Sequence, residues 1–125
     1  MQIVSQQNLI KLSLSKKEFD VLKFSIVIIW QEYHFPNPPT KSFENKFGYS
    51  FEENDCLYKE FTDLDFQKNA IVYVDFNHHR QSVFVTVLKE IVNNYEYYEF
   101  QTITGFYKHE VQKVLHDLQE ILIKK

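Results

Sequence analysis

Residues 12–34 read LSLSKKEFDVLKFSIVIIWQEYH, a short alternating run followed by a long run with helical periodicity. Ser15 and Glu18 fit the S-x-x-E capping box, in which a hydroxyl and a carboxylate satisfy free N–H groups at the start of a helix. The apolar side chains behind this box fall on one helical face: Phe19, Leu22, Ile26, Ile29 and Tyr33. The pattern predicts a first strand over 2–13 and a core helix over 16–34.

Three further elements have clear signals in the sequence. Ser50 and Glu53 form a second capping box, which predicts a helix over 51–63. Residues 70–76 read AIVYVDF, and their β-branched and aromatic content predicts a strand. Apolar residues at helical spacing near the end of the chain predict a last helix over 107–124.

Residues 82–92 fit two different structures. Their apolar positions fit a helical face, whereas six of the eleven residues are β-branched, which favours a strand. Asn93 and Asn94 then stand where a two-residue hairpin turn would lie. We choose the strand, followed by another over 95–104. The expected fold is therefore one compact α+β domain over 1–125, an antiparallel β-meander with amphipathic helices packed on it.

Composition limits the class of protein. The 125 residues carry a net charge of −3, whereas general nucleic-acid binders usually show a basic patch. The most apolar stretch, residues 24–30, has seven residues, far fewer than the roughly 20 needed to cross a bilayer. Met1 to Ile10 lack the pattern of a signal peptide, and Cys56 is the only cysteine. We expect a cytoplasmic protein with no membrane and no nucleic-acid partner, and Cys56 as a small core residue.

The residues most typical of catalysis form one cluster, His78-His79-Arg80, with Asp75 before it. Adjacent imidazoles beside a carboxylate are able to bind a metal or exchange protons in phosphodiester cleavage. The simpler interpretation, which we prefer, is a solvated hairpin loop. His109 and His116 are two helical turns apart, too far to share a metal without other ligands. We therefore expect no catalytic residues, no metal and no cofactor.

Charge is concentrated in residues 44–65. This segment holds seven acids and two bases, a net charge of −5, while the rest of the chain carries +2. Aromatic residues alternate with the acids, and aromatic anchors beside steering charges suit a protein interface. The alternative is a solvated helix whose aromatics face inward. The residues expected to bind a partner are Glu44, Tyr49, Glu52, Glu53, Asp55, Tyr58, Asp63 and Asp65.

The chain resembles the small immunity proteins that neutralise bacterial polymorphic or contact-dependent toxins. The resemblance rests on Leu14-Ser15-Lys16-Lys17-Glu18-Phe19 after a strand, the acidic aromatic centre, the strand meander, and a last helix after Thr104-Gly105-Phe106. It implies an inhibitor without catalysis that contacts its cognate toxin, often a basic nuclease. Two alternatives remain: a phage or mobile-element module for protein binding or assembly, and a small nuclease using His78, His79 and Arg80.

Overall fold

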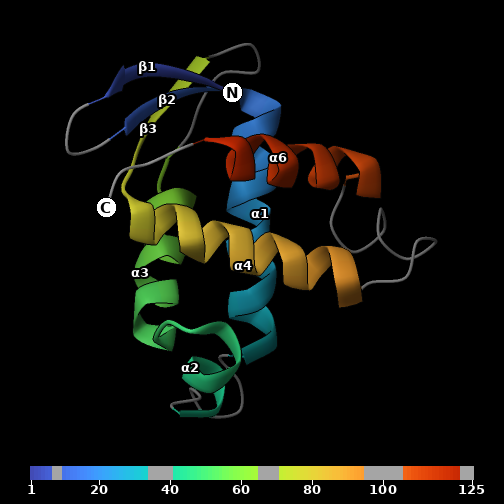
Figure 1. The fold of residues 1–125 in the computed structure, drawn as a ribbon. Helices are drawn as coiled ribbons and strands as arrows, with labels where there is room; N and C mark the ends of the chain where they lie inside the picture. Colours follow the sequence, from blue (N-terminus) through green and yellow to red (C-terminus); the bar gives the residue numbers. More distant parts are fainter. Residues whose placement is uncertain (7–9, 34–40, 65–70, 95–105, 122–125) are drawn as a thin grey trace.

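A three-stranded antiparallel sheet lies at one end of the helical part of the molecule (Figure 1). The computed structural model describes residues 1–6, 10–33, 41–64, 71–94 and 106–121. The sheet and the helices packed on it confirm the expected α+β class.

The sheet has the order β1-β2-β3, with strands β1 (Gln2–Gln6), β2 (Ile10–Ser15) and β3 (Ile71–Phe76). The one strand predicted over 2–13 is therefore two antiparallel strands, while the predicted strand over 70–76 is confirmed. Alternation along β2 and β3 directs one set of side chains into the core: Ile10, Leu12, Leu14, Val72, Val74 and Phe76.

Helix α1 (Lys16–Tyr33) is central, since it contacts β2, β3, α3, α4 and α6. The predicted capping box is present. Ser15 N donates to Glu18 Oε1 at 2.9 Å, and Glu18 N donates to Ser15 Oγ at 3.1 Å. The predicted apolar stripe is buried from Phe19 to Ile29, with Ile26 fully so, while Tyr33 is half-buried. Figure 1 shows α1 running down the middle of the molecule behind α4 and α6.

Helices α2 (Lys41–Phe47) and α3 (Phe51–Thr62) form the acidic segment. Helix α2 was not predicted; its buried Phe43 and Phe47 lie one turn apart, with ring centroids 4.5 Å apart. Helix α3 confirms the second capping signal, because Ser50 Oγ accepts from Glu53 N at 3.2 Å.

Residues 82–92, predicted as a strand, belong to helix α4 (His78–Asn94), so that prediction is wrong. The side chains buried in this part of the helix form a stripe at helical spacing: Val83, Phe84, Val87, Leu88 and Ile91. Asn77 Oδ1 accepts from Arg80 N at 2.7 Å and caps the first turn. Burial and capping outweigh the helical cost of β-branched residues, which is a few tenths of a kcal/mol each, roughly.

The same helix corrects two neighbouring predictions. His78, His79 and Arg80 lie in its first turn and not in a hairpin loop, and Asn93 and Asn94 end it and do not form a turn between strands. The strand predicted over 95–104 lies outside the described residues.

The predicted last helix is confirmed as α6 (Lys108–Glu120), which packs on α4. Its buried residues, Val111, Val114 and Leu118, follow the predicted stripe. Gln81 of α4 is buried and donates from Nε2 to two carbonyls at the end of α6, Leu118 O at 2.7 Å and Ile121 O at 2.6 Å. Within the described ranges, no helix combines the length and the apolar character that a membrane crossing needs.

Candidate functional site

Helix α3 presents three rows of side chains because residues three, four and seven apart share a face. Its inner row, Phe51, Asn54, Leu57 and Phe61, is buried. An outer row follows the same spacing and contains Glu52, Asp55, Lys59 and Asp63. A third row, Glu53, Cys56 and Glu60, faces the start of α4. The inner row fixes the helix in the core, so the two remaining rows hold the acids in defined positions.

Tyr49 does not provide the exposed anchor that the sequence suggested. It is 4% exposed, and its hydroxyl donates to Asn54 Oδ1 at 2.7 Å. Burial, and then the nearby Glu53 charge, raise the pKa of Tyr49 well above its usual range. Tyr49 is therefore a core residue, and the prediction that it is exposed is wrong.

Tyr58 and Asp55 are both tied to Trp30 of α1. The Tyr58 ring stacks on the indole with centroids 4.2 Å apart and planes 6° apart, and Tyr58 stays half-buried. Trp30 Nε1 donates to Asp55 Oδ1 at 2.8 Å, and Lys59 Nζ lies 3.0 Å from Asp55 Oδ2. The hydrogen bonds from Lys59 and then Trp30 lower the pKa of Asp55. Asp55 is thus both a surface charge and a link between helices.

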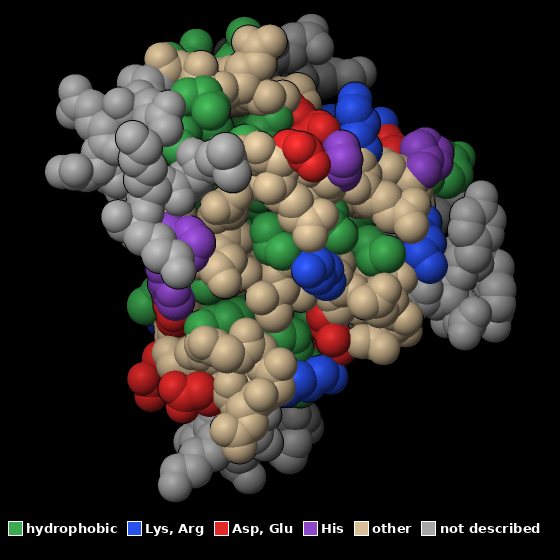
Figure 2. Space-filling model, in the orientation of Figure 1, with side chains coloured by type: hydrophobic (Ala, Val, Ile, Leu, Met, Phe, Trp, Pro, Cys, Tyr) green, Lys and Arg blue, Asp and Glu red, His purple; other side chains and the backbone are tan. Residues whose placement is uncertain are grey.

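Three of the predicted partner-binding acids are free of such ties. Glu44, Glu52 and Asp63 are exposed, and among the residues that the structure describes their carboxylates form no ion pair. Figure 2 shows acidic side chains gathered at the lower left, where Figure 1 has α3, with histidine side chains above them. Asp65 lies outside the described residues.

A hollow of about 210 Å³ separates α3 from the first turn of α4. Its lining residues are Glu53, Cys56, Leu57, Glu60, Asn77, His79 and Arg80. Two pairs cross it: His79 Nε2 lies 2.5 Å from Glu53 Oε1, and Arg80 Nη2 lies 2.9 Å from Glu60 Oε2. The hollow therefore joins two sets of candidate residues that the sequence left apart, the acidic segment and the histidine–arginine cluster.

The hollow also corrects the prediction for Cys56, which is exposed and not a core residue. Its spacing to Glu53 and Glu60, three before and four after, is the sequence signal that places all three on one face. The sequence does not show which residues lie opposite that face, because the ion pairs with His79 and Arg80 depend on how α4 packs against α3.

The structure divides the residues of the histidine–arginine cluster between different surroundings. Arg80 is held at both ends of its guanidinium, since Nη1 donates to Asp75 O at 3.1 Å while Nη2 contacts Glu60. His78 is exposed and does not line the hollow. In the described part of the chain, no three His, Cys, Asp or Glu side chains are arranged to hold a metal ion.

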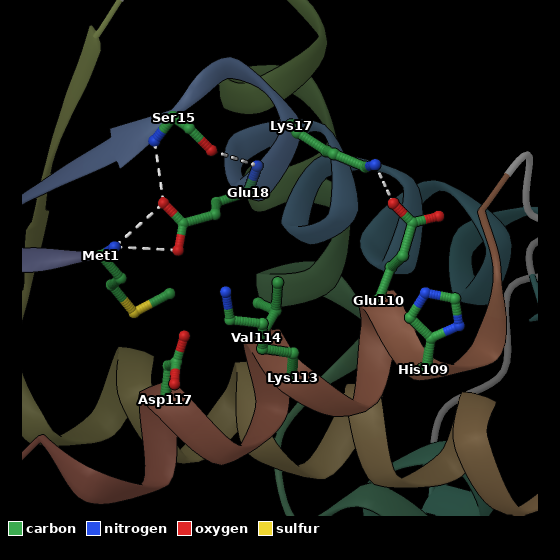
Figure 3. A pocket seen from close by; sticks show the side chains of 9 residues that line it. All are labelled: Met1, Ser15, Lys17, Glu18, His109, Glu110, Lys113, Val114 and Asp117. Atoms are coloured by element: carbon green, nitrogen blue, oxygen red, sulfur yellow. Dashed lines mark hydrogen bonds and ion pairs between the residues drawn. The ribbon is translucent and has the colours of Figure 1, made fainter.

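A second hollow of about 380 Å³ lies between the start of α1 and α6 (Figure 3). Two of its three carboxylates already serve the fold. Glu18 completes the α1 capping box and contacts the Met1 amine, and Glu110 pairs with Lys17 and accepts from Tyr107 N. Burial opposes ionisation of Glu18, but hydrogen bonds from Ser15 N–H and the amine outweigh it and lower its pKa.

The histidines of α6 do not form a site with each other. His109 lines the second hollow, where its ring stacks on Tyr107 with centroids 5.6 Å apart, whereas His116 is exposed and does not line it. The strongest candidate site is therefore the exposed side of α3 together with the hollow beside α4. Compared with known proteins, the chain matches no family model, no curated protein sequence and no solved structure.

Proposed function

We propose that the chain is a binding protein without catalysis that docks a basic protein partner on the exposed side of α3. The observation that carries the proposal is the charge of this surface. Its carboxylates are Glu52, Glu53, Asp55, Glu60 and Asp63, and the two permanent cations among them are Lys59 and Arg80. The sum is −3, equal to the net charge of the whole chain. We call these seven residues the acidic face.

The rigidity of the acidic face supports a docking role. The side chains opposite it on α3 are buried, and Phe61 stacks on Phe19 of α1 with centroids 5.3 Å apart. The backbone of a packed helix keeps its position when a partner approaches, so binding loses little backbone ordering entropy, although the exposed side chains still adjust. A concentrated negative surface also attracts a positive partner before contact and raises the association rate.

The resemblance to immunity proteins suggests the class of partner. An immunity-type inhibitor neutralises a toxin by direct contact, and a toxin that acts on nucleic acid carries positive charge where it binds phosphates. The acidic face would then cover that positive surface. The inhibitor would act in the cytoplasm of the cell that it protects. In this mechanism the chain needs neither a cofactor nor a metal, because inhibition requires only that the toxin's surface be occupied.

The test is capture of a partner from the native cell with three forms of the chain. The first is the wild type and the second carries Glu52→Gln and Asp63→Asn. The third carries Asp117→Asn and Glu120→Gln, which gives the same change in net charge on α6, a helix that contributes no residue to the acidic face.

The proposal expects one basic protein that the wild type and the α6 variant retain and the α3 variant loses at moderate salt. That protein should be toxic when produced alone and harmless when produced with the chain. A partner that is acidic, or one that all three forms retain equally, would refute docking on the acidic face. A partner whose activity the chain leaves unchanged would refute the role of inhibitor.

A further inference from the structure

The hollow between α3 and α4 is a recess within the acidic face, and its charge is unevenly compensated. Glu60 pairs with Arg80, a permanent cation that also donates to Asp75 O. Glu53 pairs with His79, whose imidazole is uncharged unless it is protonated. The recess therefore carries an excess negative charge at Glu53 whenever His79 is neutral.

The contact between His79 and Glu53 is open to replacement. The His79 side chain is 59% exposed and that of Glu53 is 36% exposed, so neither is fixed by burial. An exposed ion pair of this kind contributes at most about 1 kcal/mol. A stronger cation that reached Glu53 from outside would displace the imidazole at small cost.

An anion would not fit the recess. The amide at the third position of α4 is already used, because Arg80 N donates to Asn77 Oδ1 at 2.7 Å, and Gln81 N donates to Asn77 O at 3.0 Å. Two carboxylates line the same space, and a bound anion would be repelled by both.

We propose that this recess receives the cationic side chain of a lysine or arginine of the protein partner, which replaces His79 on Glu53. The inference rests on the proposed function and specifies one contact within the proposed docking surface. A volume of about 210 Å³ accommodates one long side chain. Its aliphatic part would pass over Leu57 and Cys56 while its charged end reached Glu53, as long cationic side chains do on mixed surfaces.

The geometry supplies a matched pair of variants. His79→Lys places an intramolecular ammonium beside Glu53, where it occupies the position proposed for the partner's cation. His78→Lys adds the same charge one residue earlier on α4, but His78 is exposed and does not line the recess. Both variants therefore make the net charge less negative by the same amount, and only His79→Lys blocks the recess.

The probe is an acetylated tetra-arginine amide, with the tetra-lysine amide in a parallel series. Each is titrated at low salt into the isotope-labelled chain and followed by NMR. The expected result is a saturable shift of the amide signals of Glu53, Cys56 and His79. His79→Lys should weaken the affinity about threefold to tenfold, and His78→Lys should weaken it less than twofold. The difference between the two variants corresponds to the free energy of one exposed ion pair. Glu53→Gln should match His79→Lys, while Glu120→Gln on α6, which is not part of the acidic face, should match His78→Lys.

Equal effects of the two lysine variants would overturn the inference, since simple charge reduction would then explain them. Shifts spread evenly over the acidic face, or no saturable shift at all, would also overturn it. Melting curves of each variant confirm that the fold is kept. If a partner is captured as proposed above and binds His79→Lys and His78→Lys equally well, the recess is not used, while docking on the acidic face stands.

Discussion

Trp30 Nε1 donates a hydrogen bond to Asp55 Oδ1 at 2.8 Å, and this contact joins the central helix α1 to the acidic helix α3. We predict that Asp55→Ala lowers the free energy of unfolding by about 1 kcal/mol, the usual value of one such hydrogen bond. Urea denaturation followed by Trp30 fluorescence measures the change. Asp55→Asn keeps the acceptor oxygen and loses the charge, so its loss should be smaller than that of Asp55→Ala and limited to the contribution of the charge. If the two variants are equally destabilised, the Lys59 pair and not the indole contact provides the stability.

The same carboxylate predicts how stability depends on pH. Contacts with Lys59 and Trp30 lower the pKa of Asp55 below its ordinary value of 3.8. A lowered pKa in the fold means that the stabilisation is complete above about pH 5, and is lost as the pH falls from 3.8 through the lower folded value. Because the side chain is 31% exposed, the effect should stay under about 1 kcal/mol. Asp55→Asn should flatten the stability curve in this acid window, so it should lie below wild type by this amount at pH 7 and approach it at low pH. An identical slope in both proteins would contradict the shift.

Gln81 links α4 to the end of α6 through its Nε2, and only a donor can make both bonds. Gln81→Glu brings a carboxylate against two carbonyl oxygens, and we predict a loss of about 2 kcal/mol or more at pH 7. Protonated glutamic acid donates again. The folded-state pKa of the introduced acid should therefore be raised, and the loss should shrink as the pH falls. Thermal melts at pH 4.5 and 7 give the comparison, with Gln81→Met as a variant that cannot titrate. A loss that does not depend on pH would show that the amide bonds do not determine stability here.

Much of the fold follows from local signals. The capping boxes at Ser15 and Ser50 placed two helices, and the β-branched run over 70–76 placed a strand, because each signal acts within a few residues. The segment over 82–92 was misassigned for the opposite reason. Its β-branched residues favour a strand locally, and the contacts that make it a helix are with α1 and α6, which no local pattern contains.

The candidate site was predictable in composition but not in arrangement. Acidic residues were found by counting charge, yet their roles differ. Glu52 and Asp63 face outward, Asp55 bonds to Trp30, and Glu53 faces His79. Tyr49 became a core residue through its bond to the buried Asn54, although its sequence neighbours suggested a surface anchor. These distinctions depend on which face of α3 meets the core, and that is a tertiary property.

The cap at the start of α4 allows a direct test of how much local capping adds to the helix. Asn77 Oδ1 accepts from Arg80 N, and we predict that Asn77→Ala costs about 1 kcal/mol, the usual range for an N-cap being roughly 0.5 to 2. Asn77→Asp keeps an acceptor; the helix dipole favours its charge while Glu53 and Glu60 across the recess oppose it, so it should stay closer to wild type than Asn77→Ala. Chemical denaturation of the three proteins provides the values. Equal stability of Asn77→Ala and wild type would show that burial alone selects the helix.

The last prediction concerns the kinetics of docking on the acidic face, once a partner is identified. Glu52 and Asp63 are exposed and lie eleven residues apart along α3, which places them on one side of the helix. Charges of this kind act before contact, so replacing both by Gln and Asn should slow association more than it speeds dissociation. The loss should fade as salt rises, because the Debye length falls from about 10 Å at 0.1 M to about 3 Å at 1 M.

Surface plasmon resonance at two salt concentrations separates these rates. The α6 variant, Asp117→Asn with Glu120→Gln, carries the same change in net charge and should associate at nearly the wild-type rate.

Tyr58→Ala should act mainly on the dissociation rate if its half-buried ring touches the partner, because short-range packing acts only once the complex has formed. If the α3 and α6 variants slow association equally at low salt, attraction comes from the overall charge of the chain and the partner docks away from α3. If only the α3 variant associates more slowly than wild type, and the difference persists at high salt, direct contacts by Glu52 and Asp63 control the association rate in place of steering.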